Sequence, residues 1–430
     1  MATHSAQTFL RPAPLPVGCA LFFDRTKPTQ AVACRFGDAP RSVARLDELP
    51  ADTLWLTNLD EGVLQLRGAA FPGIKPLHFL GISLDVLLDE FGYTTPLQPD
   101  TAAAAAADIA EVGNRVLRLV HERYGLPSLR VHTPGTLPSI LGQHLLGRSV
   151  FVTVISNSAD AAVFAALNSA FLTTRRTGYP GDLRVRPYRL RFARTSHAAQ
   201  LLSYPAPWMG GYWQPYPEDF PKRMQPAGDG TDLFRFLADL GSVRSALVRL
   251  RIGTFSNPGY AHALDPLTPD VVREWFPVHE ALFLAARAGV QLLEVLVGPE
   301  YTYLQDQPDG VPPDMSHELG VSYSHGLVAH LHWLALAAPV LAQPNPYAPP
   351  RRQATPLGVW LASWNRLRYL QAAEQLHQAT GAFVASCGTD GIEVMLQPEQ
   401  LVAVQDACPA LHLIPTPRLH RDAQLLKEFA

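Results

Sequence analysis

The chain has 430 residues, of which 47% are apolar and 17% are charged, and its formal net charge is −3. This balance predicts a folded protein of about two or three domains and excludes a disordered chain. No long apolar run and no basic-then-apolar leader is present, so we expect no membrane contact and a cytoplasmic location. Proteins that grip duplex nucleic acid usually carry a basic surplus, which this sequence lacks.

The first third of the sequence predicts a strand-rich α/β domain that is closed by a long helix. Residues 17–36 have the pattern of two strands joined by a turn. The segments 52–66 and 74–93 each predict a strand followed by a helix. Residues 99–125 have apolar side chains at helical spacing and end on a glycine, which predicts a strong helix. These elements indicate an α/β domain over about residues 1–150.

The rest of the chain is less regular. Residues 245–255 predict a strand, and residues 277–304 predict a helix, a glycine turn and a strand. A proline-rich loop at 344–356 precedes a second strong helix at 357–381. The buried face of that helix is expected to carry two tryptophans and two leucines, namely Trp360, Trp364, Leu367 and Leu370.

The segment "GAFVASCGTDGIEVML" (381–396) predicts two short apolar strands that are joined by a turn. Asp390 lies in this turn, where an acid is well placed for a metal ion. Two residues earlier, where a partner carboxylate would be useful, the chain has Gly388. The hairpin is therefore expected to resemble a metal site in which one of two carboxylates, that at position 388, is missing.

Four cysteines form no CxxC pair and no zinc spacing, and are expected to be reduced and mostly buried: Cys19, Cys34, Cys387 and Cys408. The sequence contains no GxSxG nucleophile elbow and no GxxxxGK[ST] phosphate loop. Common hydrolase and nucleotide-binding signatures are thus absent from the sequence.

Residues 357–396 resemble the end of the palm in family-B DNA polymerases, especially those of the viral and plasmid type. In that family a helix rich in aromatics and arginine leads into a hairpin of the form Tyr-x-Asp-Thr-Asp-Ser/Gly, whose place residues 386–391 take here. Residues 279–303 are similar to the helix–glycine–strand unit of the palm, and residues 177–185 resemble its Tyr-x-Gly-Gly linker motif.

The first metal motif of that palm is Asp-x-x-Ser-Leu-Tyr-Pro, and two places compete for it. The Tyr-Pro pair at 204–205 assigns Ala199 to the aspartate slot, and the pair at 216–217 assigns Gly211 to it. We favour the first, because a Gly-Gly-x-Trp stretch follows it. Neither alignment supplies a carboxylate.

The N-terminal part resembles the RNase H-like proofreading exonuclease domain of the same family, which begins with a strand carrying Asp-x-Glu. Asp24 matches the acid of that motif, but Thr26 takes the place of the glutamate. Asp60 and Asp108 match the acids of the second and third exonuclease motifs. The resemblance therefore implies a partial set of exonuclease acids.

The resemblance implies a mixed α/β and α+β fold, with reduced fingers and little or no thumb. It divides the chain into an RNase H-like domain (1–150), a connecting segment with the linker motif (151–195), the first part of the palm (196–305), a reduced fingers-like region (306–356), and the second part of the palm with a short tail (357–430).

Nucleotidyl transfer uses two divalent cations, and the protein must present several carboxylates to hold them. Asp390 would be the one acid left of the palm pair, and the chain has no lysine between Lys222 and Lys427 to hold an incoming triphosphate. We therefore expect no polymerase activity and no cofactor. Mg²⁺ or Mn²⁺ would matter only for a residual nuclease.

An arginine-rich stretch at 175–194 is interleaved with aromatic residues, a mixture that suits a nucleic-acid single strand. A strand pair with a solvated basic face explains the pattern equally well. The linker motif of the family contacts the template strand here, so the resemblance implies nucleic-acid contacts by Arg175, Arg176, Tyr179, Gly181, Arg184 and Arg186.

Our first hypothesis is a catalytically inactive polymerase-like protein, encoded by a virus, plasmid or other mobile element. It would bind single-stranded or primer–template DNA, or a replication protein partner. The second hypothesis is a metal-dependent 3′–5′ exonuclease that relies on Asp24, Asp60 and Asp108. The third is an unrelated α/β interaction protein.

Overall fold

The chain divides into two compact units: residues 1–145 with 311–331, and residues 146–310 with 332–430. Every helix in the described ranges is too short or too polar to span a bilayer. The computed structural model describes residues 15–67, 73–93, 98–126, 135–146, 185–207, 213–216, 231–255, 275–302, 319–338, 340–342, 351–388 and 391–429.

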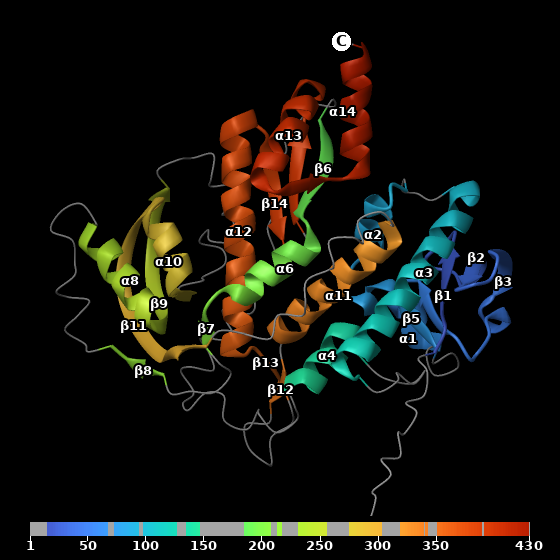
Figure 1. Cartoon of the computed structure of the whole chain (residues 1–430), viewed down its shortest axis with the longest axis horizontal. Coiled ribbons are helices and arrows are strands. Elements are labelled where there is room, and N and C mark those ends of the chain that lie inside the picture. The colour runs from blue at the N-terminus through green and yellow to red at the C-terminus, as the bar shows by residue number, and fades with distance from the viewer. Residues whose placement is uncertain are drawn as a thin grey trace, which may run out of the picture. The chain divides into compact units, whose positions relative to one another are not determined.

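The first unit is built on a mixed five-stranded sheet in the order β3-β2-β1-β4-β5 (Figure 1). β1, β2 and β3 form an antiparallel meander, whereas β4 runs parallel to β1 and β5 runs parallel to β4. This confirms the predicted strands of the region. The bounds are β1 (Val17–Phe22), β2 (Thr29–Arg35), β3 (Arg41–Arg45), β4 (Leu54–Thr57) and β5 (Ile74–Pro76).

Helix α3 packs against β1 and β2. Gly113 allows its close approach, because a Cβ there would lie 3.0 Å from the side chains of both Val17 and Leu56. The helix ends at Gly125, which adopts a left-handed conformation (φ 63°) as the sequence predicts. The helices of this region are α1 (Glu61–Arg67), α2 (Leu84–Glu90), α3 (Pro99–Tyr124) and α4 (Leu137–Leu146).

The first sheet of the second unit has the order β10-β9-β11-β7, and β8 also pairs with β11. Helices α8 and α10 pack on one face of it and share its core. The bounds are β7 (Ala206–Pro207), β8 (Gln214–Pro215), α8 (Thr231–Val243), β9 (Arg244–Phe255), β10 (Trp275–Pro277), α10 (Val278–Ala285) and β11 (Ala288–Thr302).

Of the predicted helix–glycine–strand unit at 277–304, the helix and the strand are confirmed, whereas the predicted turn at the glycine is wrong. The chain reverses at residues 286–287, and Gly289 already lies within β11. Strand β11 extends over 15 residues, and its pairing with β9 contains three register shifts.

The second sheet of this unit has the order β14-β15-β6-β16. Strands β12 and β13 form a separate two-stranded antiparallel sheet. The bounds are β6 (Arg186–Phe192), α6 (Arg194–Ser203), β12 (Val340–Ala342), β13 (Arg351–Gln353), α12 (Pro356–Thr380), β14 (Phe383–Gly388), β15 (Gly391–Leu396), α13 (Leu401–Ala407), β16 (Leu413–Pro415) and α14 (Pro417–Phe429). Helix α11 (Leu319–Ala337) belongs to the first unit up to residue 331.

Helix α12 contacts both sheets of the second unit: β7 and β10 of the first, and β14 and β15 of the second. Its start is fixed by Thr355, whose hydroxyl oxygen accepts the backbone N–H of Gly358 (2.9 Å). Its end is the left-handed Gly381 (φ 67°). The predicted buried face is confirmed for Trp360, Leu367 and Leu370, whereas Trp364 is only partly buried.

These observations confirm a mixed α/β protein with several sheets. The five-part domain division stays a prediction.

Candidate nucleic-acid interface

The β14–β15 hairpin lies directly beside β6. Ile392 of β15 pairs with Leu190 of β6, and Gly388 pairs with Gly391 across the hairpin. Gly391 has φ +151°, and a Cβ there would lie 2.5 Å from the carbonyl oxygen of Leu190. The close pairing of β15 with β6 thus depends on a glycine at the first residue of β15.

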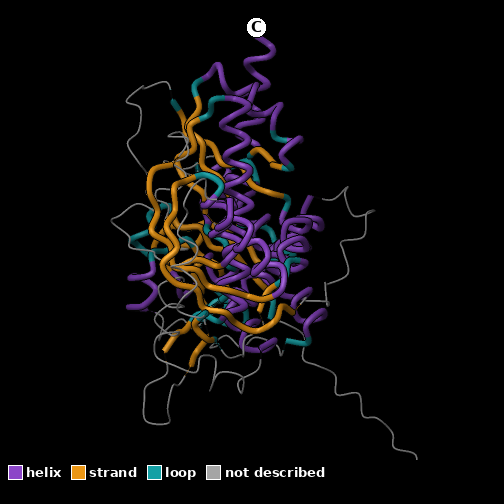
Figure 2. The backbone as a smooth tube through the Cα atoms, turned by 90° about the vertical axis from the view of Figure 1, so that its left-hand side faces the viewer, coloured by secondary structure: helices purple, strands orange, loops and turns teal. Residues whose placement is uncertain are grey.

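Strand β6 has two chemically different faces because successive side chains alternate. Tyr188, Leu190 and Phe192 are buried in a core that they share with α12, α13 and α14. Figure 2 shows the helices near the C-terminus packed along one side of the strands. Arg189 and Arg191 project from the opposite face and are partly exposed. We call these two residues the arginine pair of β6.

The neighbours of the arginine pair come from the strands on either side of β6. Glu393 of β15 is the cross-strand partner of Arg189, and it also accepts a hydrogen bond from Ser386 (3.2 Å). Ile414 of β16 is the partner of Arg191. The arginine pair and these three neighbours thus contain two guanidinium groups and one carboxylate. This excess of positive charge favours an anionic ligand.

The candidate residues of the palm do not all come together. Ala199 lies within α6, so the favoured alignment does not place it at the end of a strand. The residue that follows β6 is Ala193, which neither alignment of the metal motif selects. The alternation of apolar and charged residues in "RPYRLRF" is the sequence signal that indicates this strand. Gly388 does end β14, whereas Gly211 and Asp390 lie outside the described residues.

Of the predicted nucleic-acid contacts, only Arg186 falls on described residues. It is exposed at the start of β6 and pairs with Leu396 of β15. The other five lie outside the described ranges: Arg175, Arg176, Tyr179, Gly181 and Arg184. Within the described part of the arginine-rich stretch, strand β6 therefore carries three arginines: Arg186 and the arginine pair.

A buried polar network fixes the segment that follows β6. Nε2 of His197 lies 2.6 Å from Oδ1 of Asn365, and Nδ1 of His197 lies 2.7 Å from Nη1 of Arg368. Because a guanidinium only donates, Nδ1 accepts and the ring proton resides on Nε2. The ring of Phe192 stacks on His197, and the Arg368 guanidinium lies 4.5 Å from the centre of the Phe192 ring. These contacts join the end of β6, α6 and α12.

The pKa of His197 is lowered to about 3 by burial, with a further contribution from the positive charge of Arg368. The unfolded chain takes up a proton near pH 6.5 and the folded chain does not, so stability is lost as the pH falls below 6.5. We expect this residue to remove about 1.5 kcal/mol between pH 6.5 and pH 5. Glutamine at position 197 keeps a donor and an acceptor but does not titrate. In H197Q, the free energy of unfolding in urea should therefore fall by about 1.5 kcal/mol less between pH 6.5 and pH 5 than in the original chain. Equal pH slopes in the two proteins would contradict the assignment.

The predicted exonuclease acids lie in the first unit. β1 ends at Phe22, so Asp24 and Thr26 are in the β1–β2 turn and not on the strand. The backbone N–H and the hydroxyl of Thr26 donate to Oδ1 of Asp24 (2.9 and 2.6 Å), and Nζ of Lys27 lies 3.2 Å from Oδ2. The hydrogen bonds from Thr26, with that of Lys27, lower the pKa of Asp24. This carboxylate stabilises its own turn.

Asp60 and Asp108 occupy different surroundings. The backbone N–H of Asp60 donates to the carbonyl of Arg25 (3.0 Å), which places its loop beside the Asp24 turn. Asp108 is exposed on α3 and accepts the hydroxyl of Tyr93 (2.5 Å). Within the described ranges, no three His, Cys, Asp or Glu side chains are grouped to hold a metal ion. The three predicted acids are all described, and the fold does not gather them into such a group.

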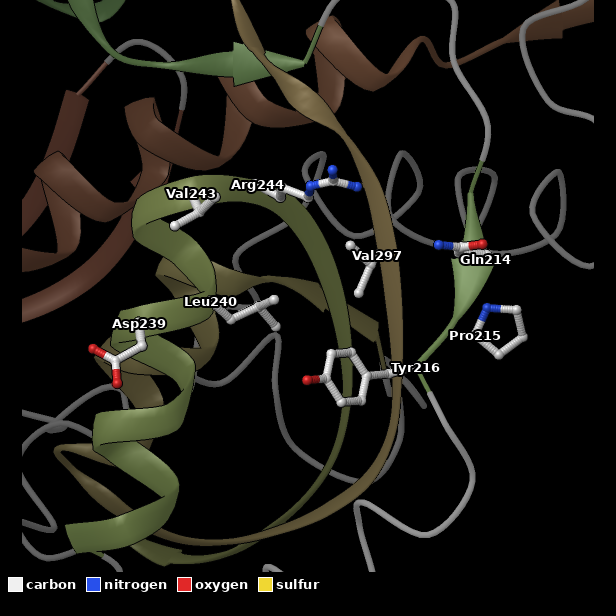
Figure 3. Close-up of a pocket in the computed structure, with 8 residues that line it drawn as sticks. All are labelled: Gln214, Pro215, Tyr216, Asp239, Leu240, Val243, Arg244 and Val297. Atoms are coloured by element: carbon white, nitrogen blue, oxygen red, sulfur yellow. The ribbon is translucent and has the colours of Figure 1, made fainter.

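A pocket of about 370 Å³ lies in the second unit between α8 and strands β8, β9 and β11 (Figure 3). Its walls are mostly apolar and provide no set of acid, base and nucleophile. The lining residues are Gln214, Pro215, Tyr216, Asp239, Leu240, Val243, Arg244 and Val297. The pocket is suited to an apolar group and adds no reactive chemistry to the arginine pair of β6.

No protein-family model matches the sequence, and no curated protein matches it. Among solved structures, the chain is similar to Phi29 DNA polymerase complexed with primer-template DNA as a post-translocation binary complex, with 12% identity and a TM-score of 0.43. It is also similar to the ternary complex with incoming nucleotides (12%, TM-score 0.38) and to an orthorhombic crystal form (13%, TM-score 0.41). Each alignment covers 89% of this chain and 80% of the other. Similarity at this level assigns no activity to the chain.

Proposed function

We propose that this chain is a polymerase-shaped protein that binds nucleic acid and does not carry out nucleotidyl transfer. The observation that carries the proposal is the pairing of the β14–β15 hairpin with β6. A two-metal polymerase site needs carboxylates at such a meeting of a strand end and a hairpin turn. The described residues here are Ala193, Gly388 and Gly391, which have no side-chain oxygen.

The remaining acids do not replace the missing ones in this proposal. The sequence has one carboxylate between Gly388 and Gly391, that of Asp390, and a single carboxylate cannot bring two dications together. Glu393 of β15 is opposite Arg189 and accepts the Ser386 hydroxyl. The expected chemistry is therefore binding without turnover, with the arginine pair of β6 contacting phosphates.

The first unit supports the polymerase-like half of the proposal. Its sheet has an antiparallel meander followed by two parallel strands, in the order β3-β2-β1-β4-β5, which is the type of sheet that an RNase H-like domain requires. The exonuclease alternative has less support. The Asp24 carboxylate is used by its own turn, and Asp108 is bonded to Tyr93.

The binding surface is tested by charge reversal of the arginine pair. We expect R189E/R191E to weaken the affinity for a fluorescently labelled single strand or primer–template by at least about tenfold at low salt. The slope of log affinity against log salt should fall by about 1.4, since two phosphate contacts are lost at about 0.7 each on a single strand. Fluorescence polarisation over a salt series measures both quantities.

The matched control is R244E/R251E, which makes the same change of charge at exposed arginines of β9 in the other sheet. This variant should bind like the original chain. Equal weakening by the two variants would mean that net charge alone acts, and the absence of wild-type binding at low salt would refute the proposal. In a primer-extension assay with Mg²⁺ or Mn²⁺, incorporation above the background would overturn the inactivity.

A further inference from the structure

Two of the four cysteines face each other across the β1–β2 ladder. Cys19 of β1 is the direct cross-strand partner of Cys34 of β2. Directly opposed residues of an antiparallel pair project from the same face of the sheet. Both thiols are free, and both are buried. The two thiol side chains are therefore direct neighbours on the same face of the sheet.

The hydrogen-bond pattern fixes the type of this pair. At one end of the ladder, the N–H of Phe36 donates to the carbonyl oxygen of Val17 (2.9 Å). Beyond the other end, the N–H of Phe23 donates to the carbonyl oxygen of Gln30 (3.2 Å). Hydrogen-bonded and non-hydrogen-bonded pairs alternate along an antiparallel ladder. Cys19 is two residues from Val17 and four from Phe23, so the cysteines form a hydrogen-bonded pair.

This type of pair can form a disulfide, but not a relaxed one. The Cα atoms of a hydrogen-bonded pair are about 5.5 Å apart, within the range of about 4.4 to 6.8 Å found in disulfides. The Cβ atoms of such pairs lie nearer 5.5 Å apart, whereas a relaxed disulfide requires about 3.8 Å. Strain of this kind makes a disulfide easier to reduce, which favours a reversible bond over a permanent structural one.

We propose that Cys19 and Cys34 form a reversible cross-strand disulfide under oxidising conditions. With a small disulfide such as oxidised glutathione, the Cys34 thiolate attacks one sulfur and releases a glutathione thiolate. The Cys19 thiolate then attacks Cys34 in the mixed disulfide and releases the second. The two thiol protons and two electrons of the cysteines end on two molecules of reduced glutathione, and one S–S bond joins β1 to β2.

The surroundings of the pair make the reaction slow without preventing it. The Cys34 thiol donates to the carbonyl of Asp38 (3.3 Å), and burial raises the pKa values of Cys19 and Cys34. Attack therefore requires local opening of the ladder under α3. Once formed, the bond joins β1 to β2, whose connecting turn contains Asp24. This inference does not depend on nucleic-acid binding.

The test uses the full chain equilibrated over a series of oxidised-to-reduced glutathione ratios. After acid quenching, alkylation and proteolysis, mass spectrometry should detect the Cys19 and Cys34 peptides joined, in a fraction that rises with the ratio. Adding reduced glutathione should reverse the link. Peptides that stay alkylated, or that carry glutathione separately, at every ratio would overturn the proposal, as would a link that reduced glutathione cannot break.

Two variants define the specificity of the reaction. A chain with C387A and C408A retains only the β1–β2 pair and should give the same linked peptide at the same ratio. C19A should lose the linked peptide, and a Cys34 peptide joined instead to another cysteine would refute the pairing. The wild-type measurement stands by itself if C19A fails to fold.

Discussion

Replacing Arg366 with methionine is expected to lower the free energy of unfolding by about 3 to 5 kcal/mol, because it leaves a buried carboxylate without its cation. Arg366 on α12 forms an ion pair with Glu280 on α10, and their side chains are 13% and 1% exposed. Water cannot solvate Glu280 after the change, so the chain must either protonate this residue or open the contact between the helices.

The effect is measured by urea unfolding of R366M against R249M. Arg249 pairs with Glu294 at 3.5 Å on the first sheet of the second unit, where the two side chains are 38% and 44% exposed. Exposed pairs contribute about 0 to 1 kcal/mol, so R249M should be nearly neutral. The double variant R366M/E280L should recover much of the loss, since a well-packed apolar pair replaces the ion pair. A loss in R366M no greater than in R249M would contradict the burial argument.

Replacing Gly391 with alanine is the second change with a large expected effect. The added Cβ would lie 2.5 Å from the carbonyl oxygen of Leu190 and 3.4 Å from Cγ of Arg189, at a backbone φ of +151°. A main-chain oxygen cannot move away without separating β15 from β6. We expect a loss of about 2 to 4 kcal/mol from backbone strain and overpacking. On the proposed function, weaker nucleic-acid binding should accompany it, because the added Cβ lies against Arg189 of β6.

The matched control for Gly391 is Gly289 in β11. A Cβ at Gly289 would meet no atom within 4 Å, so G289A should be neutral or slightly stabilising, by up to about 1 kcal/mol. Thermal and urea unfolding of both variants compare the two sites directly. If G391A is as stable as G289A, the β6–β15 pairing does not depend on a glycine at this position.

Elements whose signals are local can be predicted from the sequence. The long helices α3 and α12 were predicted because apolar side chains repeat at helical spacing and a glycine ends each helix. The β14–β15 hairpin was predicted from two short apolar runs around a turn. The absence of a carboxylate from Gly388 is likewise a property of the residue type alone.

Which of these elements pair with one another is known only from the fold. The pairing of β6 with β15 joins residues about 200 positions apart in the chain, and strand pairing over such distances has no local signal. The structure places Ala193 directly after β6 and Ala199 within α6. It also divided the arginine-rich stretch, so that Tyr188 and Leu190 enter the core while Arg189 and Arg191 form the opposite face.

The same limit applies in the first unit. The sequence determined that Asp24 follows an apolar strand, but not where that strand ends. The structure ends β1 at Phe22, and the carboxylate then bonds within its own turn because Thr26 and Lys27 are within reach. Residue types and periodicities thus determined what each segment can form. Long-range pairing decided which side chains share a surface, because contacts between distant segments depend on the whole core and not on local spacing.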